Sequence, residues 1–169
     1  LIENVPGALN DKRAVVQRTA DALGELGYQV SVGVIDLSEI GVPQRRRRLV
    51  LMGSLTHTTT PAEVVARHQR DPRDVAWAFQ DLAKMPESRR VNLVDAVARS
   101  APATRQRIDY LFENGDFDLP DSQRPACHAG GGHSYKAIYG RLAWDRSSQT
   151  ITTGFYSMCM GRYVHPSQR

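Results

Sequence analysis

The fold is decided at residues 41–53, which read GVPQRRRRLVLMG. Consecutive arginines lead there straight into an apolar run that ends at Gly53. A charge run of this kind ordinarily marks a solvated face or a nonspecific phosphate patch. Such a surface run rarely continues into a fully apolar segment, so we predict that residues 49–52 form a buried strand.

The arginines themselves fall into two sets. In an extended chain alternate residues share a face, so the side chains of one set can enter a site while the other set meets solvent or phosphate. The first set consists of Gln44, Arg46 and Arg48, and the second of Arg45 and Arg47.

The residues before this run predict an α/β unit. Residues 2–5 have the character of a strand end, followed by a Pro-Gly turn, and Asn10 or Asp11 is expected to cap a helix. Apolar residues then recur at helical spacing until Gly27, and residues 28–35 alternate with the period of a strand. Strand, helix, strand, loop and strand are typical of part of a doubly wound sheet. We therefore predict one domain over residues 1–54.

The composition changes after this unit. Residues 54–62 are rich in Ser, Thr and Pro, which indicates a boundary. Helical patches follow at 64–68, 75–82, 93–98 and 104–112, and residues 116–169 are rich in glycine, aromatics and short β-prone stretches such as 150–153. We predict a second, small and irregular α+β domain over residues 55–169.

Charge and composition indicate a globular chain that tolerates a polyanionic partner. The net charge is +4, and arginine carries nearly all of the cationic excess because lysine occurs only at Lys12, Lys84 and Lys136. The planar fork of arginine suits phosphates and base edges. No apolar run is long enough to span a bilayer. The two cysteines, Cys127 and Cys159, form no C-x-x-C, so a zinc site has no cysteine core and ordinary thiols are expected.

Two further stretches carry candidate chemistry. Glu3 lies at the carboxyl end of a predicted strand, where open α/β sheets bind ligands, although a surface glutamate before a turn is the plainer alternative. Residues 139–145 (YGRLAWD), 149–155 (QTITTGF) and 161–166 (GRYVHP) interleave arginines, hydroxyls and aromatics. That pattern suits nucleic-acid contacts, and an aromatic-rich small β domain explains it equally well.

In this order, the stretches resemble the DNA cytosine-5 methyltransferases. In that family a Glu-Asn-Val tripeptide is followed, further along the chain, by Gln-x-Arg-x-Arg at the start of a strand. Here Glu3-Asn4-Val5 is followed by residues 44–48, QRRRR. The stretches at 139–145 and 149–155 resemble the family's target-recognition region, and those at 124–128 (RPACH) and 161–166 look like the same branch.

The resemblance implies a Rossmann-like, S-adenosylmethionine-dependent methyltransferase fold and a reaction on a flipped cytosine. A cysteine thiolate adds to carbon 6, and carbon 5 takes the methyl group. Glu3 would then be the hydrogen-bond or proton donor at nitrogen 3, and Arg46 and Arg48 would bind the carbonyl oxygen. The supporting and DNA-contacting candidates are Asn4 and Gln44 for the base-binding loop, and Arg141, Thr150, Arg162 and His165 for DNA.

The departures from the family pattern also matter. Its Pro-Cys nucleophile motif and its glycine-rich cofactor loop do not occur in this sequence. Neither Cys127, after Ala126, nor Cys159, between two methionines, has the context of the nucleophile. We expect both ends of the chain to be cuts or the ends of a broken reading frame, and we expect no cofactor-binding residue and no metal site within it.

These observations predict double-stranded DNA as the partner, together with a complementing N-terminal polypeptide. No membrane contact is expected, and the location is expected to be the cytoplasm, at the nucleoid. Two functions stay open: a part of an active methyltransferase, inactive when alone, or a DNA-binding module that has lost methyl transfer.

Overall fold

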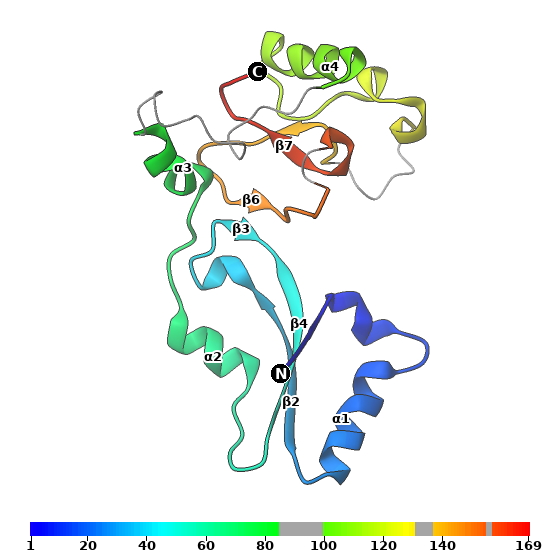
Figure 1. Cartoon of the computed structure of the whole chain (residues 1–169), viewed down its shortest axis with the longest axis vertical. Coiled ribbons are helices and arrows are strands. Elements are labelled where there is room, and N and C mark those ends of the chain that lie inside the picture. The colour runs from blue at the N-terminus through cyan, green and yellow to red at the C-terminus, as the bar shows by residue number, and fades with distance from the viewer. Residues whose placement is uncertain (85–99, 131–136, 155–156) are drawn as a thin grey trace. The chain divides into compact units, whose positions relative to one another are not determined.

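The computed structural model describes residues 1–84, 100–130, 137–154 and 157–169. Within them the chain forms two compact units, Leu1–Pro72 (unit 1) and Arg73–Arg169 (unit 2), drawn in Figure 1. The helix predicted at 93–98 and Phe155 of the stretch at 149–155 lie outside the described residues.

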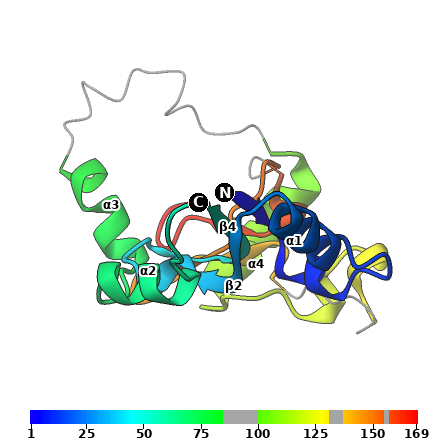
Figure 2. The ribbon, with the colours of Figure 1, turned by 90° about the horizontal axis from the view of Figure 1, so that it is seen from below.

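Unit 1 is built on a three-stranded sheet in the order β1-β4-β2. Its elements are β1 (Ile2–Asn4), η1 (Pro6–Asn10), α1 (Val15–Glu25), β2 (Gln29–Asp36), η2 (Leu37–Glu39), β3 (Gln44–Arg45), β4 (Arg47–Ser54) and α2 (Pro61–His68). Both β1 and β2 pair antiparallel with β4, so they run parallel to each other and α1 connects them. Figures 1 and 2 show α1 and α2 on opposite faces of the sheet. The mixed α/β class is confirmed, whereas the doubly wound form stays a prediction.

The central strand β4 carries the core of unit 1. Leu49, Val50 and Leu51 are all buried, as expected of an apolar strand with a neighbour on each side. The predicted strand is therefore confirmed, and it begins earlier than expected because the last arginines already pair with β2.

The start of α1 differs from the prediction. Neither Asn10 nor Asp11 caps it: Asn10 ends η1, and the Asp11 carboxylate accepts a hydrogen bond from the Arg13 amide at 3.0 Å. The N-cap is Ala14, in the left-handed region with φ 50° and without a side-chain cap. The turn η1 contains Asn10 and is capped by Asp11, so neither residue lies at the start of α1. Gly27 ends the helix as predicted, with φ 85°.

The helix α2 belongs with the sheet of unit 1. Thr60 and Glu63 form a reciprocal capping box at its start, and the buried Pro61 packs against Gly33 of β2. The Ser31 hydroxyl of β2 also donates to the Thr59 carbonyl at 2.7 Å. These contacts explain why unit 1 continues to Pro72, past the change of composition near residue 54.

Unit 2 is mostly helices, short strands and turns. Its elements are α3 (Val75–Ala83), α4 (Pro102–Glu113), η5 (Asp121–Gln123), η6 (Ala126–His128), β5 (Gly140–Arg141), β6 (Ser148–Gln149), η7 (Met158–Met160) and β7 (Arg162–Val164). The helices predicted at 64–68, 75–82 and 104–112 are confirmed by α2, α3 and α4. The strand β5 pairs parallel with β7, beside a core of Leu111, Leu119, Ile138, Tyr139 and Val164.

The β-prone stretch at residues 150–153 lies outside every strand. Thr152 instead bonds to the Tyr163 hydroxyl through both its amide, at 3.1 Å, and its own hydroxyl, at 2.7 Å. A side chain thus takes the place of a ladder partner, and the high β propensity of the threonines is overridden.

In the part of the chain that the structure describes, no helix has both the length and the apolar character needed to cross a bilayer.

Candidate functional site

The carboxylate of Glu3 forms an ion pair with Nε of Arg48. The two residues lie on neighbouring strands, β1 and β4, and are far apart in sequence. The Arg48 side chain is only 15% exposed, whereas that of Glu3 is 53% exposed. The expected convergence of Glu3 with one of the two arginines is therefore confirmed. The pair fixes a cationic fork beside a carboxylate that remains open to a ligand.

The alternation of the arginine run is also confirmed. Arg46 and Arg48 are half-buried, and Arg45 and Arg47 are exposed. Arg48 is held a second time, because its Nη1 donates to the Arg47 carbonyl at 2.8 Å. The half-buried set is the one predicted to enter the site.

A carboxylate that the sequence did not single out lies at the base of this run. Asp36 ends β2, and its carboxylate accepts hydrogen bonds from the Ser38 amide at 3.1 Å and from the Ser38 hydroxyl at 2.9 Å. Partial burial raises the pKa of Asp36, but these hydrogen bonds and the positive charge of Arg45 outweigh it, so the pKa lies below its ordinary 3.8. Asp36 is therefore a fixed negative charge under the arginines.

The two supporting residues have more modest surroundings. The side chain of Asn4 accepts a hydrogen bond from the Val5 amide at 2.8 Å, just before η1, which suits a role in holding the loop after Glu3. Gln44 is half-buried in β3, and its backbone amide donates to the Val42 carbonyl at 2.7 Å. Both supporting roles stay predictions.

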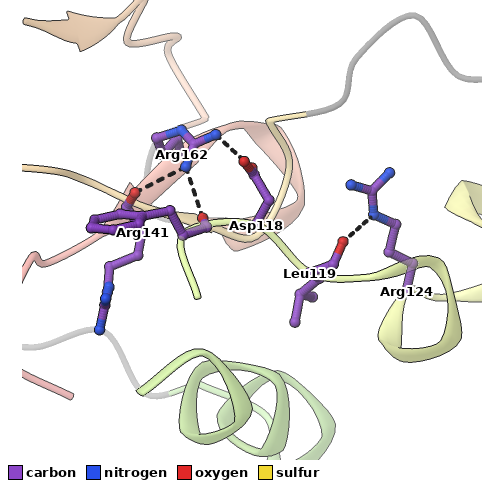
Figure 3. Close-up of polar contacts among 6 residues, drawn as sticks. Asp118, Leu119, Arg124, Arg141 and Arg162 are labelled. Carbon is purple, nitrogen blue, oxygen red and sulfur yellow. Dashed lines mark hydrogen bonds and ion pairs between the residues drawn. The ribbon is translucent and has the colours of Figure 1, made fainter. Parts of the chain in front are cut away.

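In unit 2, Arg162 is engaged with the unit's own backbone (Figure 3). Its Nη1 donates to the carbonyls of Phe117, at 2.7 Å, and Arg141, at 3.1 Å, and its Nη2 pairs with Asp118. The side chain is 16% exposed. This guanidinium links the segment after α4 to β5 and β7. A DNA contact by Arg162 would therefore need an N–H group that these partners do not use.

Arg141 is held by aromatic rings. Its guanidinium carbon lies 4.8 Å from the Phe112 ring centroid and 4.6 Å from that of Phe117. Nη2 donates to the Gly115 carbonyl at 3.3 Å. Stacked guanidinium groups of this kind stabilise packing as well as recognition, and the predicted DNA contact of Arg141 stays a prediction.

His165 lies in an aromatic cluster. Its ring stacks on Phe79, with centroids 5.7 Å apart, and meets Trp144 edge to face at 5.3 Å. Nδ1 accepts hydrogen bonds from the amides of Ser167 and Gln168, so the ring is neutral with its proton on Nε2. Burial lowers the pKa of His165 below its ordinary 6.5. The fourth candidate for DNA contact, Thr150, is half-buried just after β6.

Neither thiol of this chain lies in unit 1. Cys127 is exposed, and Cys159 is half-buried with its sulfur 3.0 Å from the Ser157 hydroxyl. The described residues contain no group of three or more His, Cys, Asp or Glu side chains that could hold a metal ion.

Comparison with known proteins decides the family. The model of the C-5 cytosine-specific DNA methylases matches residues 1–119, which include the Glu3–Arg48 pair, all of unit 1 and α4. The chain belongs to this family.

Individual relatives extend the match across the whole chain. The Type II methyltransferase M1.BsuMI of Bacillus subtilis is 37% identical over 98% of this chain, and 38% of its own length is covered. The Type II methylase M.HgiDII of Herpetosiphon aurantiacus is 30% identical over 99% of this chain, with 48% of its length covered. The chain thus spans less than half the length of these two relatives.

Sequence reasoning missed two residues that shape this methylase chain. Asp36 has a local signal, because Asp-x-Ser after a strand is typical of a side chain that caps a turn. Tyr163 has none: its hydroxyl contacts Thr152 and donates to the Met160 carbonyl at 3.0 Å, and only the folded unit brings these groups together.

Proposed function

We propose that this chain supplies the base-binding and DNA-recognition residues of an enzyme that transfers a methyl group from S-adenosylmethionine to carbon 5 of a flipped cytosine. The observation that carries the proposal is the Glu3–Arg48 ion pair between β1 and β4. A pyrimidine presents nitrogen 3 beside its carbonyl oxygen, and a carboxyl group beside a guanidinium matches that edge.

The chemistry asks for charge stabilisation at this edge. Addition of a thiolate to carbon 6 places negative charge on the ring, toward nitrogen 3 and the carbonyl oxygen. Glu3 donates at nitrogen 3, and the guanidinium of Arg48, with that of Arg46, binds the oxygen. A carboxylic acid keeps its proton at neutral pH only when it is shielded from water. The bound base itself would provide that shielding for the open side of Glu3.

Two hollows among the described residues of unit 1 are candidate sites for the methyl donor. One hollow of unit 1 is lined by Gln29, Met52, Gly53, Ser54, His57 and Thr59, and another lies along α1 between Val15 and Leu26. Neither presents the acidic side chain that commonly holds the ribose of a nucleoside cofactor. We therefore assign no cofactor contact to these two hollows.

A further polypeptide is proposed to complete unit 1. The helix α1 buries none of its residues, and the strand β1 is an edge of the sheet. Apolar side chains there are open to solvent, including Ile2 at 46%, Val15 at 51% and Leu26 at 71% exposed. An exposed edge and an uncovered helix face call for a packing partner. We propose that the N-terminal part of the same methyltransferase, with its Pro-Cys motif, is that partner.

Unit 2 is proposed to recognise the DNA duplex. The relatives M1.BsuMI and M.HgiDII are Type II methyltransferases by name, so we propose that the complete enzyme modifies a defined site within a restriction-modification system. Its place of action would be the nucleoid.

The test is an assembled enzyme, in which this chain is fused behind the N-terminal segment of M1.BsuMI that precedes the matched region. Transfer of a tritiated methyl group to duplex DNA is measured for the assembled enzyme, for its Glu3→Gln variant and for the chain alone. We expect turnover from the first, a fall of about 10²-fold or more for Glu3→Gln, and background from the chain alone. Glu25→Gln, an exposed change at the end of α1, is the matched control and should keep full activity.

The alternative function predicts different results. An inactive DNA-binding module would bind duplex with a steep salt dependence and give no turnover in the assembled enzyme. Turnover by the chain alone would assign the nucleophile to Cys127 or Cys159 and contradict the proposal. Full activity of Glu3→Gln would remove its assigned role.

A further inference from the structure

Most arginines in the described part of unit 2 are used by the unit itself. A guanidinium that donates to carbonyls or carboxylates has fewer N–H groups left for an outside partner. Figure 3 shows such bonds for Arg124 and Arg162. The arginines held in this way are Arg107, Arg124, Arg141, Arg162 and Arg169. The Arg73 guanidinium has no carbonyl or carboxylate partner among the described residues, and Arg146 has only a long ion pair with the neighbouring Asp145, at 3.9 Å.

Hydrogen bonds bring these two arginines together at the start of α3. The Val75 amide donates to the Arg146 carbonyl at 3.0 Å. The Ser147 hydroxyl donates to the Arg73 carbonyl at 2.7 Å. The turn at residues 144–147 is therefore fastened to the first turn of α3, and it places two arginines that are far apart in sequence side by side.

Both tryptophans of the chain lie at the same place. The Trp144 carbonyl accepts the Ala76 amide of α3 at 3.0 Å, and Trp144 is 38% exposed. Trp77 is 42% exposed, and the Arg73 guanidinium carbon lies 3.8 Å from the centroid of its ring. A guanidinium keeps its N–H groups in its own plane, so stacking on the indole orients these donors without using them.

We propose that the exposed arginines and tryptophans at the start of α3 contact the sugar-phosphate backbone of duplex DNA. This α3 surface consists of Arg73, Trp77, Trp144 and Arg146. Two neighbouring arginines with unused donors fit phosphate oxygens, and the exposed indoles fit the apolar face of deoxyribose. Trp144 belongs to the stretch at 139–145, so the α3 surface extends DNA recognition from that stretch to a helix that precedes it. The proposal rests on the proposed function in one respect, because it takes duplex DNA as the substrate.

The acidic side chains at the α3 surface leave room for an anion. The Asp74 carboxylate is the N-cap of α3 and accepts the Trp77 amide at 2.7 Å, so this bond holds its charge against the helix. Arg146 and Asp145 have side chains that are 79% and 80% exposed. A long ion pair at such exposure contributes little, and a phosphate, which binds a guanidinium through short charge-assisted hydrogen bonds, replaces Asp145 as the partner of Arg146.

The first arm of the experiment measures duplex binding by this chain. Binding of a fluorescein-labelled duplex of mixed sequence is followed by anisotropy over a series of salt concentrations for the unmodified chain, Arg73→Gln, Arg146→Gln and the control Arg105→Gln. We expect Arg73→Gln and Arg146→Gln each to flatten the slope of log K against log salt by about 1, because each loses one phosphate contact. Arg105 is an exposed arginine of α4 outside the α3 surface, and its variant should keep the slope. Equal changes in every variant, or no duplex binding by the unmodified chain at low salt, would overturn the inference.

The second arm uses the tryptophans as reporters. Trp144→Phe leaves Trp77 as the only indole of the chain, and Trp77→Phe leaves Trp144. Acrylamide quenching of the remaining indole is measured with and without saturating duplex, and we expect the duplex to reduce it in both variants because DNA covers the exposed rings. Unchanged quenching with bound duplex overturns the inference. The same holds if Trp77 is already shielded in the assembled enzyme before DNA is added, measured against the Trp77→Phe variant of that enzyme, since a polypeptide then covers the α3 surface.

Steady-state methyl transfer by the assembled enzyme separates this inference from the proposed function. Arg73→Gln and Arg146→Gln should raise KM for duplex DNA more than they lower kcat, because a backbone contact is made equally before and during the reaction. An enzyme that turns over with an unchanged KM in both variants contradicts only the inference. An inactive assembled enzyme whose duplex binding still weakens in both variants supports the inference and contradicts only the methyl transfer proposed above.

Discussion

Two arginines, one in each unit, are equally buried and yet differ in what holds them. The side chain of Arg48 in unit 1 is 15% exposed, and that of Arg162 in unit 2 is 16% exposed. Arg48 pairs with a carboxylate that is itself half exposed. Arg162 spans two backbone carbonyls and Asp118, which join separate segments of its own unit.

The comparison shows that partners, more than burial, indicate the role of an arginine. Carbonyls that lose a charged donor are left without a protein partner, so Arg162 is a structural crosslink. An ion pair with one half-exposed partner contributes only about 0.2–1 kcal/mol to stability, so stability alone does not account for the Glu3–Arg48 pair, and its role in binding a base is the proposal to be tested.

The largest expected effect is a loss of activity when Arg48, the arginine of unit 1, is removed. Arg48→Ala in the assembled enzyme should lower methyl transfer by about 10²-fold or more, because the charge that develops on the base loses a preorganised cation. The unfolding of the chain should change little. The control is Arg47→Ala, which removes an exposed guanidinium from the opposite face and should keep most of the activity. Equal losses in both variants would favour a nonspecific phosphate patch.

The matching change in unit 2 should act on stability. Arg162→Ala is expected to lower the free energy of unfolding of unit 2 by about 2 kcal/mol, since several hydrogen bonds from a charged group are lost. Both tryptophans, Trp77 and Trp144, lie in unit 2, so urea denaturation followed by their fluorescence reports on it. Arg146→Ala is the control: its pair with Asp145 is 3.9 Å long and almost fully exposed, and its effect should stay within about 0.5 kcal/mol. A stable Arg162→Ala variant that binds DNA poorly would instead make Arg162 a DNA contact.

Local patterns explain how much of unit 1 could be predicted. The apolar run in β4, the helical spacing in α1 and the period-2 alternation of the arginines are properties of short segments, and the structure confirms them. The convergence of Glu3 with Arg48 needed the family resemblance, because no local pattern sets the order of β1 and β4. The cap of α1 was mispredicted because Asn10 is the last residue of the preceding turn η1, which begins at Pro6, and is therefore not at the start of α1.

Tertiary contacts explain why the site in unit 2 was harder to predict. The partners of Arg162 lie more than twenty and more than forty residues away along the chain, so no sequence window contains them. The same holds for the Tyr163 hydroxyl and Thr152. A motif rich in arginine, threonine and aromatics reads as a recognition surface, yet several of these side chains hold one another in place.

A smaller effect on the stability of unit 2 is expected when the hydrogen bonds between Tyr163 and Thr152 are removed. Tyr163→Phe removes the hydroxyl that contacts Thr152 twice and Met160 once. Gly161 leaves the room for that ring, since a Cβ there would lie 2.5 Å from it. We expect a loss of about 1 kcal/mol in unit 2 and weaker duplex binding by electrophoretic shift. The control is Tyr110→Phe, whose hydroxyl forms no hydrogen bond with the described residues. Unchanged stability and binding would show that the stretch is held by other contacts.

The smallest expected effect is a pH dependence of the stability of unit 2 that comes from His165. His165 is half-buried against Phe79 and Trp144 with its pKa below 6.5, and as an imidazolium it could no longer accept from the Ser167 and Gln168 amides. The unfolded chain therefore binds a proton at His165 before the folded unit does. The contribution of His165 to stability is therefore complete above pH 6.5, and the free energy of unfolding falls as the pH drops from 6.5 through the folded pKa.

Denaturant titrations at a series of pH values, read by tryptophan fluorescence, should show this slope in the unmodified chain and lose it in His165→Gln. His68→Gln, an exposed histidine of α2 in unit 1, should leave the slope as it is. If the slope persists in His165→Gln, another group of unit 2 titrates, and His165 is then free for the DNA contact first predicted for it.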